Sequence, residues 1–245
     1  MAATYHRGHA HRDLAGAAGD LLERCTISTK ISPRPGHPPL RDQAWRAVED
    51  LGSVPAVMLV HNPETVVAGL SPTEARRWWS ATAETMADLV ARGACRMWGL
   101  ASWDPRVLGA LLDSRTGAQT PSPQVAMVRA GFLVPAGVLT ASDTLLHQLG
   151  LPHANRWGMS PFAGQPHLLD GINLTQFLTG PPPGAAQLPA ALAAAFHLPE
   201  VSRIAVGAST PAHLDQLLDA VDVGIQHQRL SDYRQRLTTH AAKAS

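Results

Sequence analysis

Several features that would mark a particular class of protein are scarce in this chain of 245 residues. Its 20 Lys and Arg nearly balance 19 Asp and Glu, so the net charge is +1 and no basic stripe suggests nucleic-acid binding. Two cysteines, Cys25 and Cys95, are too few for a disulfide framework or a zinc site. No apolar run approaches the roughly 20 residues of a membrane span, and no signal peptide is evident. These absences predict a cytoplasmic globular protein.

What the chain does contain is a series of short apolar runs, each followed by a helical pattern. The run Val57–Val60 reads as a strand buried on both faces, and it ends in His61-Asn62-Pro63. The preceding run, Thr26–Ile31, carries Lys30 near its end. In a parallel α/β protein the functional residues lie at the carboxyl ends of the strands. We therefore expect Lys30 and His61 to share a site.

Strands and helices alternate along the whole sequence, which predicts a parallel sheet. The predicted strands are 26–31, 57–60, 96–101, 124–128, 156–159 and 201–206. The predicted helices are 13–23, 40–51, 71–91, 104–112, 142–149, 187–196, 211–221 and 227–242. No linker or internal repeat divides the chain, so residues 1–245 are predicted to form one domain. An open doubly wound sheet and a closed barrel both fit this alternation, but the first strand-to-helix turns lack a Gly-x-Gly-x-x-Gly fingerprint.

Tyr5 and three histidines lie close together near the N-terminus. His6, His9 and His11 have spacings that could place imidazoles on a metal ion. Asp13 is the only neighbouring carboxylate, and no cysteine is close. The favoured interpretation is a solvated loop before a helix, with no metal.

The order of the strand endings resembles that of the aldo/keto reductase family over nearly the whole chain. That family has a tyrosine before a helix, then a strand ending in Thr-Lys, then one ending in His-Asn-Pro. Here Tyr5, Thr29-Lys30 and His61-Asn62-Pro63 take those places. Three later turns also resemble family motifs, at residues 99–103, 159–164 and 206–211. The resemblance implies a TIM-type (β/α)8 barrel that uses NADPH to reduce an aldehyde or ketone.

The resemblance also implies roles for the three side chains at the carbonyl end. Tyr5 would donate the proton, although the ordinary pKa of a tyrosine is about 10. Lys30 would supply the ammonium that favours the phenolate, and His61 would orient and polarise the carbonyl.

Nine residues would hold the cofactor by the same resemblance: Ser102, Ser160, Pro161, Phe162, Gly207, Ser209, Thr210, His213 and Gln216. The helix that opens at Thr210-Pro211 also offers backbone N–H groups to a phosphate. Four positions depart from the family pattern. Trp103, Met127, Met159 and Ser209 stand where the family usually has Asn, Gln, an aromatic residue and Arg. These departures predict a weakened hold on NADPH.

The family pattern also places two strands and an aspartate ahead of the tyrosine, and the sequence has no room for them. The expected fold is therefore a (β/α)8 barrel without its first two strands, with about six βα units. Either the natural gene starts upstream of Met1, or the protein is shortened. A shortened barrel would expose two strand edges. Either a partner chain, such as a second copy of this chain, covers these edges, or the remaining strands close differently.

Three functions follow from these observations. The retained Tyr5, Lys30 and His61 favour an NADPH-dependent carbonyl reductase acting on a small molecule in secondary metabolism or a sugar pathway. The four departures at cofactor positions favour a barrel of reductase ancestry that performs non-redox acid–base chemistry, such as cyclisation or dehydration. The open edge favours a non-catalytic subunit.

Overall fold

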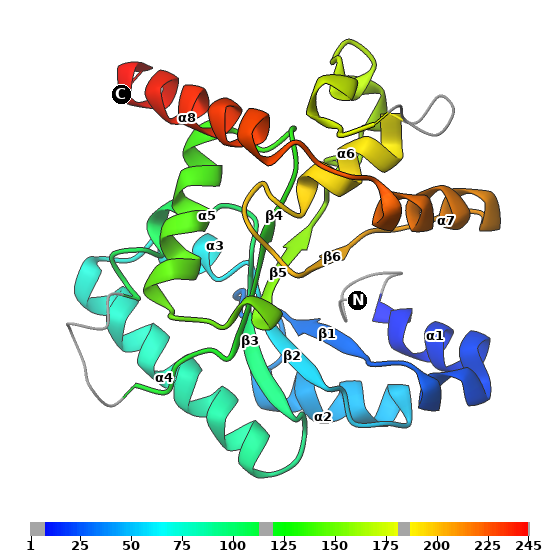
Figure 1. Cartoon of the computed structure of the whole chain (residues 1–245). Helices are drawn as coiled ribbons and strands as arrows, with labels where there is room; N and C mark the ends of the chain where they lie inside the picture. The colour runs from blue at the N-terminus through cyan, green and yellow to red at the C-terminus, as the bar shows by residue number, and fades with distance from the viewer. Residues whose placement is uncertain (1–7, 113–119, 181–186, 245) are drawn as a thin grey trace. The chain divides into compact units, whose positions relative to one another are not determined.

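The structure is a computed structural model whose chain divides into two compact units (Figure 1). The residues that it describes are 8–112, 120–180 and 187–244. The first unit comprises Met1–Met127 and Leu145–Leu151, and the second comprises Val128–Thr144 and Pro152–Ser245. Tyr5 lies outside the described residues, so its role stays a prediction.

Three parallel strands form the centre of the first unit: β1 (Ser28–Ile31), β2 (Val57–His61) and β3 (Met97–Ser102). Most of their side chains are buried on both faces, as the continuous apolar runs predict. The register aligns Lys30 with Leu59, Leu59 with Gly99, and His61 with Ala101. Because aligned residues of parallel strands point to the same face, this register determines which side chains meet.

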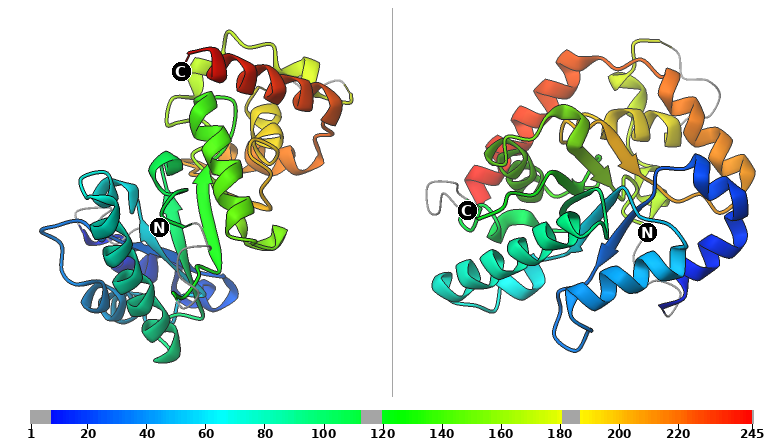
Figure 2. Two further views of the ribbon diagram at one scale, coloured as in Figure 1. Left: turned by 90° about the vertical axis from the view of Figure 1, so that its left-hand side faces the viewer. Right: turned by 90° about the horizontal axis from the view of Figure 1, so that it is seen from below.

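Helices pack against these strands (Figure 2). The elements are α1 (Ala10–Ala18), η2 (Gly19–Arg24), α2 (Leu40–Leu51), α3 (Glu64–Val67), α4 (Pro72–Ala91) and η3 (Pro105–Val107), where η marks a 3-10 helix. α2 contacts β1, α4 contacts β3, and the two helices lie side by side. α4 begins at a capping box, in which Ser71 accepts from the backbone of Glu74 and the Glu74 carboxylate accepts from the backbone of Ser71.

The second unit contains β5 (Arg156–Met159) and β6 (Arg203–Ala205), which also pair in parallel. Its helices are η5 (His153–Asn155), η6 (Pro166–Leu169), η7 (Leu174–Phe177), α6 (Gln187–Ala195), α7 (Pro211–Leu218), η8 (Asp219–Asp222) and α8 (His227–Ala244). An aromatic cluster of Phe132, Phe177 and Tyr233, with ring centroids 5.0–5.7 Å apart, ties α8 to η7. Two elements continue from one unit into the other, β4 (Val125–Arg129) and α5 (Ala136–Gln148).

The six strands stand in the sheet in their order along the chain, β1-β2-β3-β4-β5-β6. Helices separate consecutive strands, which is the βα order of part of a (β/α)8 barrel. The predicted fold class is therefore confirmed, with six βα units. No helix among the described residues has both the length and the apolar character that a membrane crossing demands.

Two helical predictions are corrected by the structure. The predicted helix over 104–112 is wrong, because only Pro105–Val107 forms a 3-10 turn and Leu108–Leu112 continues as turns. Gly109 lies in this short segment, and short helices with glycine are marginal. The helix predicted at 142–149 begins earlier, at Ala136 directly after Pro135. The prediction of one domain over residues 1–245 stays a prediction.

Candidate functional site

Lys30 and His61 lie on one face of the strands in the first unit. Lys30 is aligned with Leu59, and His61 follows Leu59 by two residues, so all three side chains point to the same side. The aligned residues of β3 on that side are Gly99 and Ala101, which are small. The structure thus brings together two of the three predicted catalytic residues at the carboxyl ends of neighbouring strands.

Burial and charge set the protonation of these two groups. Only 8% of Lys30 is exposed, and burial lowers the pKa of its ammonium. Burial, together with the nearby positive charges of Lys30 and Arg34, lowers the pKa of His61 to about 4. At neutral pH the His61 imidazole is therefore uncharged, with one N–H donor and one acceptor nitrogen. A neutral imidazole beside a buried ammonium can hydrogen-bond a polar ligand without delivering a proton of its own.

The choice of lysine at this position is itself informative. The sequence has 20 cationic side chains, of which two are lysines and 18 are arginines. One of the two lysines occupies the buried end of β1. Burial shifts the pKa of an ammonium readily, whereas a guanidinium stays charged. Lysine at the end of β1 therefore favours a chemical role over a purely structural one.

Glu64 is a buried carboxylate beside this pair, and the sequence analysis assigned it no role. It is 7% exposed and opens α3, three residues after His61. Its carboxylate accepts hydrogen bonds from the Ser102 hydroxyl at 2.9 Å, the Trp103 N–H at 2.8 Å and the Asp104 N–H at 3.3 Å. Burial raises the pKa of Glu64, and these hydrogen bonds act against that rise. Glu64 thereby joins the turn after β2 to the turn after β3.

The turn that follows His61 has an uncommon backbone. Asn62 has φ +52°, in the left-handed region, and its N–H donates to the carbonyl of Ala101 at 2.7 Å. Ser160, directly after β5 in the second unit, has φ +55°. Non-glycine residues in this region are uncommon and concentrate at functional sites. Two strand ends that the sequence analysis singled out therefore carry this signature.

Seven of the nine predicted cofactor-binding residues line one cavity of about 450 Å³ in the second unit. They are Ser160, Pro161, Phe162, Gly207, Ser209, His213 and Gln216. Leu188, Leu217 and Val206 supply apolar walls, with Pro166, Ala205 and Gly164 completing the lining. The cavity thus lies between the turn after β5 and the start of α7. The binding role of its residues stays a prediction.

The remaining two residues have clear positions of their own. Thr210 is the N-cap of α7, and its hydroxyl accepts from the backbone N–H of His213 at 3.2 Å. His213 Nδ1 in turn lies 3.0 Å from the Ser209 hydroxyl. Ser102, in the first unit, is fully buried, and its hydroxyl donates to Glu64. The Ser102 proton is therefore committed to a carboxylate within the protein.

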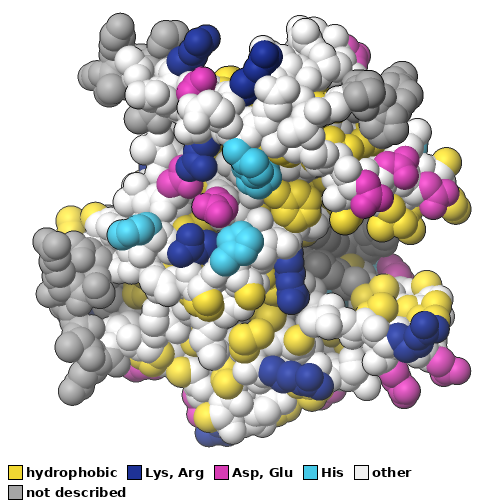
Figure 3. All heavy atoms as spheres, viewed as in Figure 1, with side chains coloured by type: hydrophobic (Ala, Val, Ile, Leu, Met, Phe, Trp, Pro, Cys, Tyr) yellow, Lys and Arg dark blue, Asp and Glu magenta, His cyan; other side chains and the backbone are white. Residues whose placement is uncertain are grey.

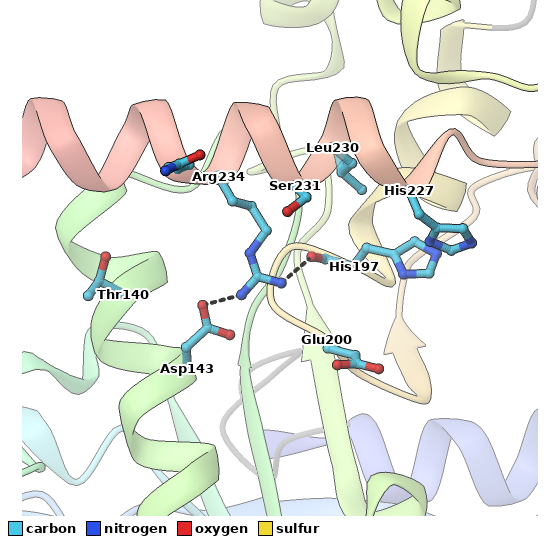
Figure 4. A pocket seen from close by; sticks show the side chains of 9 residues that line it. Thr140, Asp143, His197, Glu200, His227, Leu230, Ser231 and Arg234 are labelled. Atoms are coloured by element: carbon cyan, nitrogen blue, oxygen red, sulfur yellow. Dashed lines mark hydrogen bonds and ion pairs between the residues drawn. The ribbon is translucent and has the colours of Figure 1, made fainter.

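A second cavity in the second unit, of about 550 Å³, gathers titratable side chains from α5, α8 and the loop before β6 (Figure 3). Figure 4 shows Arg234 pointing to Asp143, with which it forms an ion pair, and to the carbonyl of His197. The rings of His197 and His227 meet edge to face at 4.8 Å. Burial chiefly lowers the pKa of His197. These contacts fasten α8 to α5, which is a structural role.

The histidines near the N-terminus are not brought together in the described part of the chain. His6 lies outside it, and His9 is exposed. His11 is buried, with its Nε2 2.6 Å from the Thr29 hydroxyl. Among the described residues no group of three or more His, Cys, Asp or Glu side chains is placed to hold a metal ion. His11 therefore packs α1 against β1.

Comparisons with known proteins bear on the fold. No family model and no curated protein matches this sequence. An aldo-keto reductase from Bacillus halodurans in its holo form aligns with a TM-score of 0.67 and 17% identity, over 96% of this chain and 80% of that one. An aldo/keto reductase from Klebsiella pneumoniae in complex with NADP and acetate aligns with a TM-score of 0.68 and 18% identity, over 97% and 78%.

An aldose reductase from Giardia lamblia aligns equally well, with a TM-score of 0.67 and 18% identity, over 98% of this chain and 82% of that one. Identities this low show the fold alone. The architecture is therefore a partial (β/α)8 barrel. More narrowly, this chain has the fold of the aldo/keto reductases, and the resemblance drawn from its strand endings is confirmed at the level of fold.

Proposed function

We propose that this chain is a carbonyl reductase that reduces an aldehyde or ketone with NADPH. The observation that carries the proposal is the pair of Lys30, which is buried, and His61, which is partly buried, on one face at the carboxyl ends of β1 and β2. Similar structures include a Klebsiella pneumoniae enzyme bound to NADP and another bound to NADPH. A fold alone does not imply an activity, so the weight rests on these side chains.

The proposal assigns each side chain a distinct task. His61 is uncharged at neutral pH, so its N–H donates a hydrogen bond to the carbonyl oxygen and polarises it. Tyr5 delivers the proton that this oxygen needs when the carbonyl becomes an alcohol. The Lys30 ammonium stabilises the phenolate that Tyr5 becomes when it gives up this proton. NADPH, when bound, supplies the hydride that reaches the carbonyl carbon.

The cavity of the second unit suits part of this cofactor. Phe162, Leu188 and Leu217 can cover a flat ring, and Ser209, His213 and Gln216 offer hydrogen bonds at the adenosine end. The first N–H groups of α7 can face a phosphate. None of the described side chains that line the cavity is Lys or Arg. The hold on the phosphates is therefore expected to be weaker than a cation would provide.

A titration of NADPH fluorescence with the full chain tests the proposal, followed by absorbance at 340 nm with an aldehyde. We expect binding and turnover, with Tyr5→Phe and Lys30→Met losing at least about tenfold in kcat while NADPH binding changes little, because proton transfer matters only in the transition state. Arg46→Met, on the exposed face of α2, is the matched control and should behave like the wild type. No binding at millimolar NADPH would overturn the proposal.

The second candidate is proton-transfer chemistry without hydride. The described lining of the cavity contains no Lys or Arg, and this favours the second candidate, because a non-redox enzyme has no dinucleotide phosphates to bind. The same titration separates the two functions, because the second candidate predicts that the chain does not bind NADPH. It also predicts that Lys30 and His61 are needed for the proton transfer.

A further inference from the structure

The loop after β3 is held in one conformation by a buried carboxylate. Burying a carboxylate is costly unless hydrogen bonds compensate, and Glu64 directs three to this loop, one each from Ser102, Trp103 and Asp104. Two of these bonds come from backbone N–H groups, so they restrain the main chain whatever the side chain at 103. The backbone at Trp103 is therefore rigid.

Trp103 exposes a large apolar side chain at the edge of the strands where Lys30 and His61 lie. It is 43% exposed, although tryptophan is usually well buried. It follows β3 directly, two residues after Ala101, which is aligned with His61. A tryptophan has two side-chain torsions, so an indole on a restrained backbone loses little conformational entropy when it stacks on a ligand, which makes it an effective contact surface.

The charges around this edge restrict the kind of ligand. An exposed indole face attracts flat rings and also cations. Lys30 and Arg34 place positive charge close enough to His61 to lower its pKa. The same charges repel a cationic ligand. Glu64 and Asp104 place negative charge beside Trp103 and disfavour an anionic ligand, so a neutral aromatic ring satisfies all of these conditions.

We infer that Trp103 is the specificity-determining residue of this edge, that it selects carbonyl compounds bearing an aromatic ring, and that Glu64 is its positioning residue. This inference rests on the proposed reductase function for its substrate class. The aromatic preference itself is a property of binding, and it can be measured without turnover.

The experiment compares benzaldehyde with cyclohexanecarbaldehyde, which are close in size but differ in having a flat ring. Dissociation constants are measured by ligand-observed NMR with the full chain. We expect benzaldehyde to bind about three- to tenfold more tightly, the range that an aromatic pair provides. Trp103→Phe should keep the preference and Trp103→Ala should lose it, and neither change removes the backbone N–H that Glu64 holds.

Two further variants complete the test. Trp45→Ala removes a comparably exposed indole (37%) from α2 and should leave the preference unchanged. Glu64→Gln should reduce the preference partway while Glu64→Asp restores part of it, which a purely structural role would not do. An unchanged preference in Trp103→Ala, or an equal loss in Trp45→Ala, would refute the inference.

The oxidation of NADPH with the same two aldehydes tests the proposed function separately. Turnover with no binding preference would overturn the inference and leave the reductase proposal intact. A binding preference without NADPH oxidation would support the inference about Trp103 and would overturn the reductase proposal.

Discussion

His61 illustrates how the environment of one residue sets its chemistry. An ordinary histidine has a pKa near 6.5, but burial and the charges of Lys30 and Arg34 lower that of His61 to about 4. Above pH 6.5 the group is neutral in both folded and unfolded chains. Between 6.5 and 4 only the unfolded chain takes up the proton, so acidification through this window removes stability.

This residue yields a test by comparison with His61→Gln, which keeps hydrogen-bonding atoms but does not titrate. Urea denaturation at pH 7.0 and pH 4.5 should show that the wild type loses about 1–2 kcal/mol more unfolding free energy than the variant, a value discounted for partial exposure. An NMR titration of His61 should give a midpoint well below 6.5. Equal losses in the two proteins would mean that His61 titrates normally.

Glu64 is a second residue whose chemistry depends on its surroundings, and no simple sequence pattern identified it. Its partners Ser102, Trp103 and Asp104 are 38 to 40 residues away in the chain. The only local signal is an acidic residue at the first turn of a short helix after His61-Asn62-Pro63, where acids commonly favour the helix dipole. That signal explains why the residue is acidic, but it gives no indication of the hydrogen bonds that Glu64 accepts from the turn after β3.

Among the elements, β3 depends on a close approach that only glycine permits. A Cβ on Gly99 would overlap the carbonyl oxygen of Val125 and would lie 2.9 Å from Leu59 Cδ2. The neighbouring backbone cannot yield as a flexible side chain could. Gly99 therefore allows β3 to lie close to the backbone of residue 125 in the register that places Lys30 and His61 on the same face of the strands.

Gly99→Ala should consequently lower the unfolding free energy by at least about 2 kcal/mol, in the upper range of overpacking costs. Gly171→Ala is the control, because it has no neighbour within 4 Å of the added Cβ and an ordinary φ, and it should change stability by less than about 0.5 kcal/mol. Urea denaturation measures both. Similar small effects in the two variants would show that β3 has room for a side chain.

At the scale of the whole molecule, the sheet has two edge strands. β1 and β6 are the outermost strands in the strand order of the described residues, and the backbone groups along an edge strand can pair with another chain. In the second unit α7 and η8 also expose Leu214, Leu218 and Val221, spaced as one helix face beside acidic side chains (Figure 3). Together these features favour a homo-oligomer.

Size-exclusion chromatography with light scattering should accordingly give a mass of at least twice the 26.0 kDa of one chain. Leu218→Lys should shift that mass toward the monomer, because it places a charge in the apolar face. Leu168→Lys, at a similarly exposed leucine in η6, is the control. A wild-type monomer at micromolar concentration would contradict the expectation.

The sequence by itself determined the positions of the strands and the pairing of Lys30 with His61. Short apolar runs such as Val57–Val60 are typical of buried strands, and their alternation with helices implies parallel order. Polar residues at the ends of neighbouring parallel strands must then lie at one edge. Local composition is sufficient for each of these steps.

Only the tertiary structure decided the rest, because it depends on contacts between distant parts of the chain. It showed that His61 is uncharged, which follows from the burial and charges that surround it. It revealed Glu64 behind Trp103, the space that Gly99 leaves for Val125, and the cavity that collects residues from 160 to 217. Periodicity in a sequence reports which face of an element is apolar, but it carries no information on which distant side chain fills the space opposite.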